Sequence, residues 1–188
     1  MSRRTLTRAG PNLRGRANPF IADRQAAWDK DVTSRLPELL RELLASPIYG
    51  LTNGRPLPPE KYGIYLLVAD HDEPMYVGRV GLTERSRLAG KKFASFRTRI
   101  RGHVAPRHNN GTYAYYRTCT LFRAQGRTLG TRKQNCDDAD FMTEFRRQCE
   151  LVRNMGVRVV EINDNKLAAV FEVYAATVLG LPQTFATS

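Results

Sequence analysis

Residues 63–80 read Gly-Ile-Tyr-Leu-Leu-Val-Ala-Asp-His-Asp-Glu-Pro-Met-Tyr-Val-Gly-Arg-Val. Two short apolar runs in this stretch lie on either side of a polar corner, Asp70–Glu73. Apolar runs separated by such a corner are typical of a β-hairpin. The rest of the predicted fold is arranged around this hairpin.

The two strands of the hairpin predict a surface rich in tyrosine and glycine. With the turn centred between residues 70 and 71, Tyr65 lies opposite Tyr76, and Gly63 lies opposite Gly78. Side chains alternate along a strand and cross-strand partners share a face of the sheet. Both tyrosine hydroxyls are therefore expected to emerge from a patch that the glycines leave bare, which suits a ligand.

The composition favours a single folded domain with a polyanionic partner. The chain has 188 residues, 41% of them hydrophobic, which is enough for one domain with a core. A net charge of +12 points first to nucleic acid, ahead of ribosomal, chaperone-bound or membrane-peripheral roles. No apolar run is long enough to span a membrane, which favours a cytoplasmic protein. Cys119, Cys136 and Cys149 form no CxxC pair, so we expect reduced, structural thiols.

The first 60 residues predict a basic arm and a helical extension. Residues 1–18 contain arginines and no acid, which predicts a disordered arm that is either a solvated tail or a phosphate contact. Within residues 19–60, apolar side chains recur at helical spacing from Ala22 to Ser46, and Pro37 suits the first turn of a second helix. Two helices, or one kinked helix, then lead into a turn-rich linker. These helices either pack across the domain or form a homodimer contact.

A basic segment follows the hairpin. From Arg79 to Arg107 there are nine Lys or Arg residues against one acid, an imbalance that favours phosphate binding over a merely solvated face. Apolar residues at helical spacing predict a helix with a core-facing stripe of Phe93, Phe96, Ile100 and Val104. On that helix Arg99 and His103 are one turn apart and could converge on one anion. The predicted DNA contacts are Gly78, Arg85, Arg87, Lys91, Lys92, Arg97 and Arg101.

The remaining residues complete an α+β fold. In chain order we expect a helix over 109–125, a loop over 126–135, a helix over 137–154, a strand over 156–162 and a helix over 165–179. The first of these tolerates a strand as well, but Asn109 or Asn110 as a cap favours a helix. The predicted sheet is small, three-stranded and mainly antiparallel. It consists of the hairpin and the third strand, flanked by helices.

Glu172 stands out within the last predicted helix. Its neighbours three and four residues away are all alanine: Ala168, Ala169, Ala175 and Ala176. A surface glutamate usually has a polar or oppositely charged residue at those positions. Either Glu172 stabilises a helix that packs tightly on another element, or the alanines leave room for a metal ion. Mg²⁺ commonly binds through one or two carboxylates together with phosphate and water.

Together, these residues resemble the GIY-YIG endonuclease family. Gly63-Ile64-Tyr65 matches the first motif, and Tyr76-Val77-Gly78 matches the second with its common valine variant. Arg79 stands where the family often has lysine or arginine. The long segment between Tyr76 and Arg99 resembles the freestanding and restriction-type branches.

The resemblance extends beyond the hairpin. Arg99 and His103 fit the family's arginine and its histidine or tyrosine four residues later, and Glu172 resembles the glutamate of the final helix. The implied domain is a GIY-YIG-like nuclease over residues 61–188. Leu181-Pro182-Gln183-Thr184 occupies the place of an asparagine that often follows the last helix. Either the nuclease activity is therefore weakened, or Gln183 takes the place of that asparagine.

The resemblance implies hydrolysis of DNA phosphodiester bonds with one Mg²⁺ or Mn²⁺ ion held by Glu172. The implied catalytic residues are Tyr65, Tyr76, Arg79, Arg99, His103 and Glu172. Arg99, a forked permanent cation, suits a phosphate oxygen. Tyr65 is the preferred general base and Tyr76 the second choice. A free tyrosine is a poor base at neutral pH, but a nearby metal-bound water or a cation such as Arg79 favours the phenolate and lowers the tyrosine pKa.

The other roles and the rival functions follow from the same residues. His103 either orients the attacking water or shares its proton, and Gly78 lets the backbone approach the strand being cut.

The main alternative is a nucleic-acid-binding protein that keeps the fold but has weakened or lost cleavage. A structural or ribosome-associated basic protein is a third class. Restriction, repair, homing and phage defence all use such domains, and the fold does not choose among them.

Overall fold

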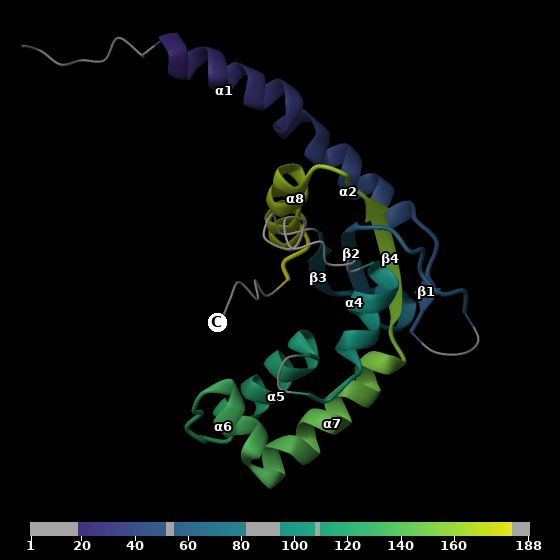
Figure 1. Cartoon of the computed structure of the whole chain (residues 1–188), viewed down its shortest axis with the longest axis vertical. Helices are drawn as coiled ribbons and strands as arrows, with labels where there is room; N and C mark the ends of the chain where they lie inside the picture. The colour runs from purple at the N-terminus through teal and green to yellow at the C-terminus, as the bar shows by residue number, and fades with distance from the viewer. Residues whose placement is uncertain (1–18, 52–54, 82–94, 108–109, 182–188) are drawn as a thin grey trace, which may run out of the picture. The chain divides into compact units, whose positions relative to one another are not determined.

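The computed structural model describes residues 19–51, 55–81, 95–107 and 110–181 (Figure 1). The chain divides into two compact units, Met1–Arg35 and Leu36–Ser188. The first unit contains helix α1 (Pro19–Asp31) and the 3-10 turn η1 (Thr33–Arg35). From residue 23 to the end of this unit the side chains are exposed, except for half-buried Val32. The predicted basic arm, residues 1–18, lies outside the described residues.

The second unit is built on a four-stranded antiparallel sheet in the order β1-β4-β2-β3. Its strands are β1 (Tyr49–Gly50), β2 (Gly63–Val68), β3 (Pro74–Val80) and β4 (Gly156–Glu161). The α+β class is confirmed, but the predicted number of three strands is wrong. The additional strand, β1, pairs with β4 over two residues only, too few to give an alternating sequence pattern.

The helices of the second unit agree with most of the sequence predictions. They are α2 (Leu36–Ala45), α4 (Phe96–His103), α5 (Thr112–Ala124), α6 (Arg132–Asp137), α7 (Ala139–Arg153) and α8 (Asn165–Val178). Pro37 lies in the first turn of α2, and a separate helix precedes it, as predicted. Among the described helices, none has both the length and the apolar character needed to cross a bilayer.

Two helix predictions are wrong in detail. The residue that caps α5 is Gly111, with φ of 64°, rather than Asn110, and Asn109 lies outside the described residues. The predicted loop 126–135 also contains most of α6. This short helix begins at a capping box in which the Thr131 hydroxyl accepts from the Gln134 N–H at 3.3 Å, and the Gln134 side chain accepts from the Thr131 N–H at 2.8 Å.

Helices cover both faces of the sheet. Tyr65 and Leu67 point to the face that packs against α4, α5 and α7, in a core that includes Phe96 and Phe145. The alternate residues of β2, such as Ile64, point to the other face, where α2 and α8 contact the strands and each other. In Figure 1 the helices α5, α6 and α7 form a cluster of their own, which α4 connects to the sheet.

The hairpin has a different register from the predicted one. Tyr65 pairs with Gly78 and Leu67 pairs with Tyr76, so the expected pairs Tyr65–Tyr76 and Gly63–Gly78 are wrong. The turn between the strands is the 3-10 segment η2 (Asp70–Asp72), and the pairing is irregular between Leu67 and Val68, just before this turn. The shift is two residues, which leaves every side chain on its predicted face. Tyr65 and Tyr76 therefore still lie on the same side of the sheet.

Candidate active site

Tyr65 lies at the centre of a cluster of aromatic rings. Its hydroxyl is 2.5 Å from Nε2 of His103, and its ring centroid is 6.0 Å from that of Tyr76. The His103 ring is also in contact with Tyr76, at a centroid distance of 5.5 Å. The strands β2 and β3 position the tyrosines, and α4 positions the histidine. Ser95 caps helix α4, its hydroxyl accepting from the Thr98 N–H, and the helix brings His103 over the sheet.

The glycines of the hairpin make room for neighbouring atoms of the fold and do not leave a bare surface. A Cβ at Gly78 would lie 2.2 Å from the Tyr65 hydroxyl oxygen, so the absence of a side chain makes room for the tyrosine. Gly63, with φ of 144°, would place a Cβ 2.2 Å from the carbonyl oxygen of Val160 in β4. The prediction that both hydroxyls emerge from the surface is wrong, because Tyr65 is 0% exposed and Tyr76 is 4% exposed.

Burial sets the protonation of Tyr65. It raises the pKa of Tyr65 well above the usual value of 10.0, and Tyr76 adds to the increase, whereas Arg99 opposes it through its charge and a hydrogen bond. The cation that acts on Tyr65 is therefore Arg99 from α4, and not Arg79 as the sequence suggested. In the free protein Tyr65 is a neutral phenol.

His103 is a buried, neutral imidazole. Burial and, to a smaller extent, the charge of Arg99 lower the pKa of His103 to about 3. The ring is 2% exposed, and its Nδ1 has no hydrogen-bond partner among the described residues. At neutral pH one ring nitrogen donates and the other accepts, so His103 can take the Tyr65 hydroxyl as a donor at Nε2.

Glu172 has a partner from outside its helix. Nε of Arg79 lies 3.4 Å from the Glu172 carboxylate, and Nη1 of Arg79 donates to the carbonyl oxygen of Asn165 at 3.3 Å. Burial raises the pKa of Glu172, while the charges of Arg79 and Arg99 oppose that increase. The ion pair joins the edge strand β3 to α8. It explains how a glutamate surrounded by alanines is compensated.

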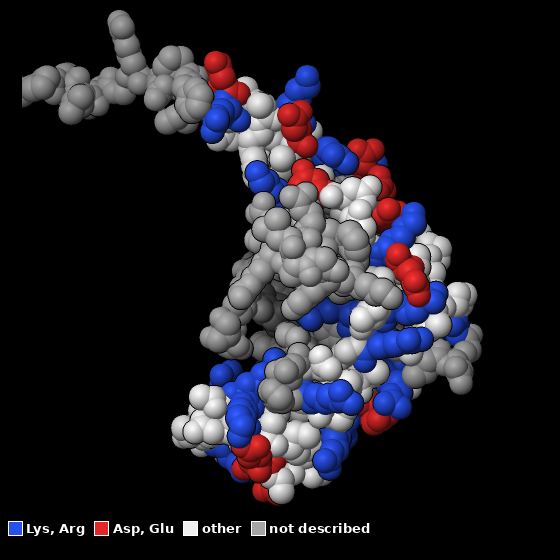
Figure 2. Space-filling view, viewed as in Figure 1, with Lys and Arg blue, Asp and Glu red and all other residues white. Residues whose placement is uncertain are grey.

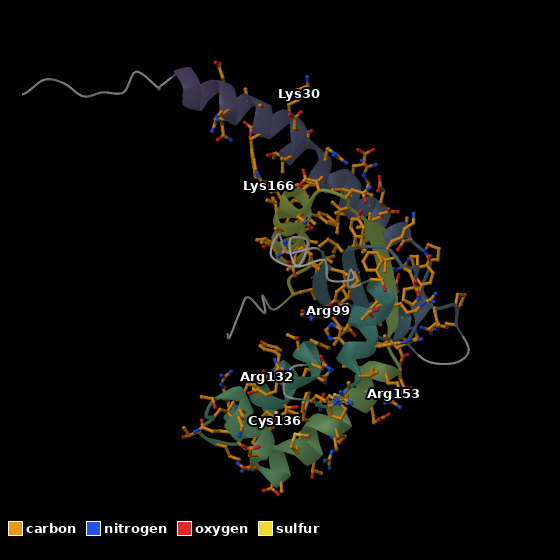
Figure 3. All side chains as sticks on the ribbon, viewed as in Figure 1. Lys30, Arg99, Arg132, Cys136, Arg153 and Lys166 are labelled. Atoms are coloured by element: carbon orange, nitrogen blue, oxygen red, sulfur yellow. The ribbon has the colours of Figure 1, made fainter. Side chains whose placement is uncertain are left out.

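Arg99 connects the aromatic cluster to Glu172. The pKa of Arg99 is raised chiefly by its interaction with Tyr65, with smaller contributions from Tyr76 and Glu172. Figure 3 labels Arg99 on α4. The structure thus brings together all six residues that the sequence selected as catalytic, from β2, β3, α4 and α8.

The predicted DNA-contacting residues divide into four groups. Gly78 is buried against the Tyr65 hydroxyl, so its backbone is not open to a DNA strand. Arg85, Arg87, Lys91 and Lys92 lie outside the described residues, as does Gln183. Arg97 forms an ion pair with Glu60 at 2.9 Å, whereas Arg101 is exposed on α4.

Over the lower part of the view in Figure 2, where Figure 1 shows α5 to α7, basic side chains outnumber acidic ones.

A single carboxylate is the potential metal ligand in this site. Among the described residues, no group of three or more His, Cys, Asp or Glu side chains lies close enough together to hold a metal ion. The Glu172 side chain is 20% exposed, so part of its carboxylate is open to a hard cation. An ion there would take its other ligands from water and from a bound phosphate.

A cavity beside His103 was not anticipated from the sequence. It has a volume of about 190 Å³ and lies between α4 and the beginning of α5. Its lining includes Arg99 and His103 together with Thr98, Asn110 and Thr112, which belong to no motif. The Asn110-Gly111 pair is a turn signal that could have indicated a bend here, but not a cavity.

Comparisons with known protein families, with curated proteins and with solved structures found no match for this chain.

Proposed function

We propose that this protein is a DNA endonuclease that hydrolyses phosphodiester bonds with one divalent metal ion. The supporting observation is the convergence of residues from distant parts of the sequence. Tyr65 contacts His103 directly, and Arg99 interacts with both Tyr65 and Glu172. The roles that the family resemblance implies require such proximity.

Arg99 would bind the phosphate to be cleaved. Its guanidinium carries a permanent charge and forked donors that match phosphate oxygens. In the free protein this charge lies near the Tyr65 hydroxyl and the Glu172 carboxylate. A phosphate bound to Arg99 is therefore next to both the proposed base and the proposed metal ligand.

Glu172 would hold Mg²⁺ or Mn²⁺. The ion would neutralise the charge that develops on the leaving oxygen. Because Arg79 lies against Glu172 at 3.4 Å, its guanidinium has to move aside or turn to the substrate when a cation binds. The charges of Arg79 and Arg99 favour the ionised form of Glu172, against burial, whose larger effect raises its pKa.

Tyr65 would remove the proton from the attacking water, with Tyr76 as the second candidate. A tyrosine is a base only as phenolate, and burial in the free protein works against that form. Nε2 of His103 is the nearest acceptor for the phenolic hydrogen, at 2.5 Å. A bound phosphate anion beside His103 would favour the protonated imidazole and so assist this transfer.

Cleavage of supercoiled plasmid DNA in the presence of Mg²⁺ tests this function. The wild-type protein is expected to nick the plasmid, and Glu172→Gln, which keeps the shape but loses the charge, is expected to be at least about 100-fold slower. Binding of the same DNA should be retained, because most of the affinity comes from many phosphate contacts. Glu150→Gln on the exposed side of α7 is the matched control and should cleave normally.

A nucleic-acid-binding protein without cleavage is the alternative function. The observation that favours it is the complete burial of Tyr65, whose neutral form is a poor base. Binding of DNA by the wild type with no cleavage over a range of pH and with either Mg²⁺ or Mn²⁺ would support this alternative. Equal cleavage by the wild type and Glu172→Gln would instead overturn the role of Glu172.

A further inference from the structure

A long segment of the chain that includes α4 and α5 contains no acidic residue. Residues 85–136 hold 13 Lys or Arg residues and no Asp or Glu, although the whole chain has 18 acids in 188 residues. Within this segment, neither the candidate site nor the DNA contacts predicted from the sequence extend beyond His103. The basic residues that follow His103 therefore have no role in the function proposed so far.

Helix α5 has an apolar inner face and a basic outer face. The inner face packs in the core that α5 shares with α7, through the buried side chains of Tyr115, Cys119 and Phe122. The outer face of α5 consists of Tyr116, Arg117, Thr120 and Arg123, which recur at helical spacing. Thr120 and Arg123 are exposed, and no residue of α5 is acidic. This face therefore presents cations and hydroxyl groups without a compensating acid on the same helix.

Arg123 differs from most cations that follow it in the chain. Ion pairs with neighbouring acids, at 2.7 to 3.3 Å, hold Arg127, Lys133, Arg147 and Arg153. None of the acids in the described residues forms an ion pair with Arg123. Arg147 is the opposite case, because its Nε and Nη2 both donate to the Glu144 carboxylate. The charge of Arg123 is therefore available to an external anion, and that of Arg147 is already neutralised.

The outer face of α5 adjoins the candidate site. Tyr113, in the first turn of α5, stacks on Tyr76 with the ring centroids 5.2 Å apart. Arg117 follows one turn later, and its guanidinium carbon lies 5.9 Å from the centroid of the Tyr113 ring. From Tyr113 to Arg123 the helix advances by about 15 Å, the rise of about four base pairs of B-DNA. DNA bound at the candidate site would thus have this face within a few base pairs.

We propose that the outer face of α5 is a docking surface for the backbone of duplex DNA, a few base pairs away from the bond that is cut. The inference rests on the proposed function and adds to it a surface outside the reacting groups. Arginine, threonine and tyrosine are among the side chains that contact DNA phosphates. A membrane surface suits α5 less well. A helix on a membrane inserts its apolar face, and the apolar face of α5 is already buried in the core.

The salt dependence of DNA binding by the full chain tests the proposal. Affinity for a fluorescent duplex is measured in EDTA, so that no cleavage occurs. Each phosphate contact contributes about 0.9 to the slope of log affinity against log salt concentration, so Arg123→Gln should reduce the slope by about 0.9. The matched control is Arg147→Gln, which also removes one charge from an exposed helical arginine and should keep the slope of the wild type. A slope in Arg123→Gln equal to that of the wild type would overturn the proposal.

A second pair of variants adds a negative charge instead of removing a positive one. Thr120 on α5 and Thr143 on α7 are both exposed, and each hydroxyl donates to the carbonyl oxygen four residues earlier, at 3.1 and 2.9 Å. Thr120→Glu should weaken DNA binding at least about fivefold at low salt, because it places a carboxylate next to the bound phosphates. Thr143→Glu should bind DNA as the wild type does. Equal weakening by the two variants would show that only total charge matters, and would overturn the proposal.

The docking surface and the nuclease function can fail separately. A reduced slope in Arg123→Gln, with a wild type that does not cleave in Mg²⁺, would support the docking surface and count against the nuclease. An unchanged slope with active cleavage would do the reverse. Vesicles of anionic lipid test the membrane as the partner. Loss of vesicle binding in Arg123→Gln, with DNA binding unchanged, would overturn the proposal in favour of a membrane surface.

Discussion

The Tyr65 hydroxyl fills the position that a side chain at Gly78 would need. An added Cβ would approach this oxygen to 2.2 Å, and the ring cannot move because it is fully buried. Gly78→Ala is therefore expected to lower the free energy of unfolding by about 1–3 kcal/mol, which urea denaturation would measure. Gly102→Ala is the control, since its Cβ meets an ordinary contact of 3.7 Å. Equal stability of Gly78→Ala and the wild type would contradict this packing.

The low pKa of buried His103 predicts that the protein loses stability in mild acid. Its pKa is about 3 in the folded protein and 6.5 as the ordinary value, so the unfolded chain binds a proton first as the pH falls. The contribution is present above about pH 6.5 and is lost as the pH falls towards 3. Between about pH 7.5 and about pH 5 the free energy of unfolding should drop by about 2 kcal/mol from this group alone.

The variant His103→Gln isolates this effect, because glutamine does not titrate. Urea denaturation at both pH values should show a smaller drop for the variant than for the wild type. The carboxyl groups present in both proteins cancel in that comparison. Parallel pH dependences would show that His103 is protonated, or exposed, in the folded protein.

At the scale of secondary structure, the beginning of α8 determines where Glu172 lies. The Asp164 carboxylate caps this helix and accepts from the N–H groups of Lys166 and Leu167 at 2.8 and 3.2 Å. Asp164→Ala should lower the free energy of unfolding by about 0.5–2 kcal/mol, as measured by thermal or urea denaturation. Asp164→Asn keeps a hydrogen-bond acceptor and should lower the free energy of unfolding much less. If both variants lose the same amount, the cap bonds do not stabilise α8.

The elements themselves were predictable to different degrees. The helices α7 and α8 and the strands β2 to β4 follow from apolar periodicity over six or more residues. Strand β1 and helix α6 were missed, because two residues and six residues give little periodicity. Helix α6 is revealed by the capping-box pattern of Thr131 and Gln134, a local signal that the apolar pattern does not contain.

At the scale of the whole molecule, the two compact units predict that the second is stable without the first. Residues 23–35 are exposed apart from half-buried Val32, so over this described part of Met1–Arg35 the truncation removes no fully buried side chain. The fragment Leu36–Ser188 should melt within a few degrees of the full chain in circular dichroism. A large decrease in melting temperature would show that residues 1–35 contribute to the core.

The same fragment tests the proposed homodimer. Trp28 on α1 is 43% exposed, as a residue at a subunit contact would be in the separated chain. If α1 forms the contact, sedimentation should give a dimer for the full chain and a monomer for Leu36–Ser188. A monomeric full chain would exclude this homodimer at the concentration measured.

The sequence by itself determined the residues of the candidate site and the elements that carry them. Glycine and tyrosine in the hairpin, the Arg99–His103 spacing and the alanines around Glu172 are local features, readable without coordinates. Tertiary structure alone decided the hairpin register, the burial of Tyr65, the Arg79–Glu172 ion pair and the cavity beside His103. These depend on atoms distant in sequence, since the pKa of a side chain and the space around it are set by whatever packs against it.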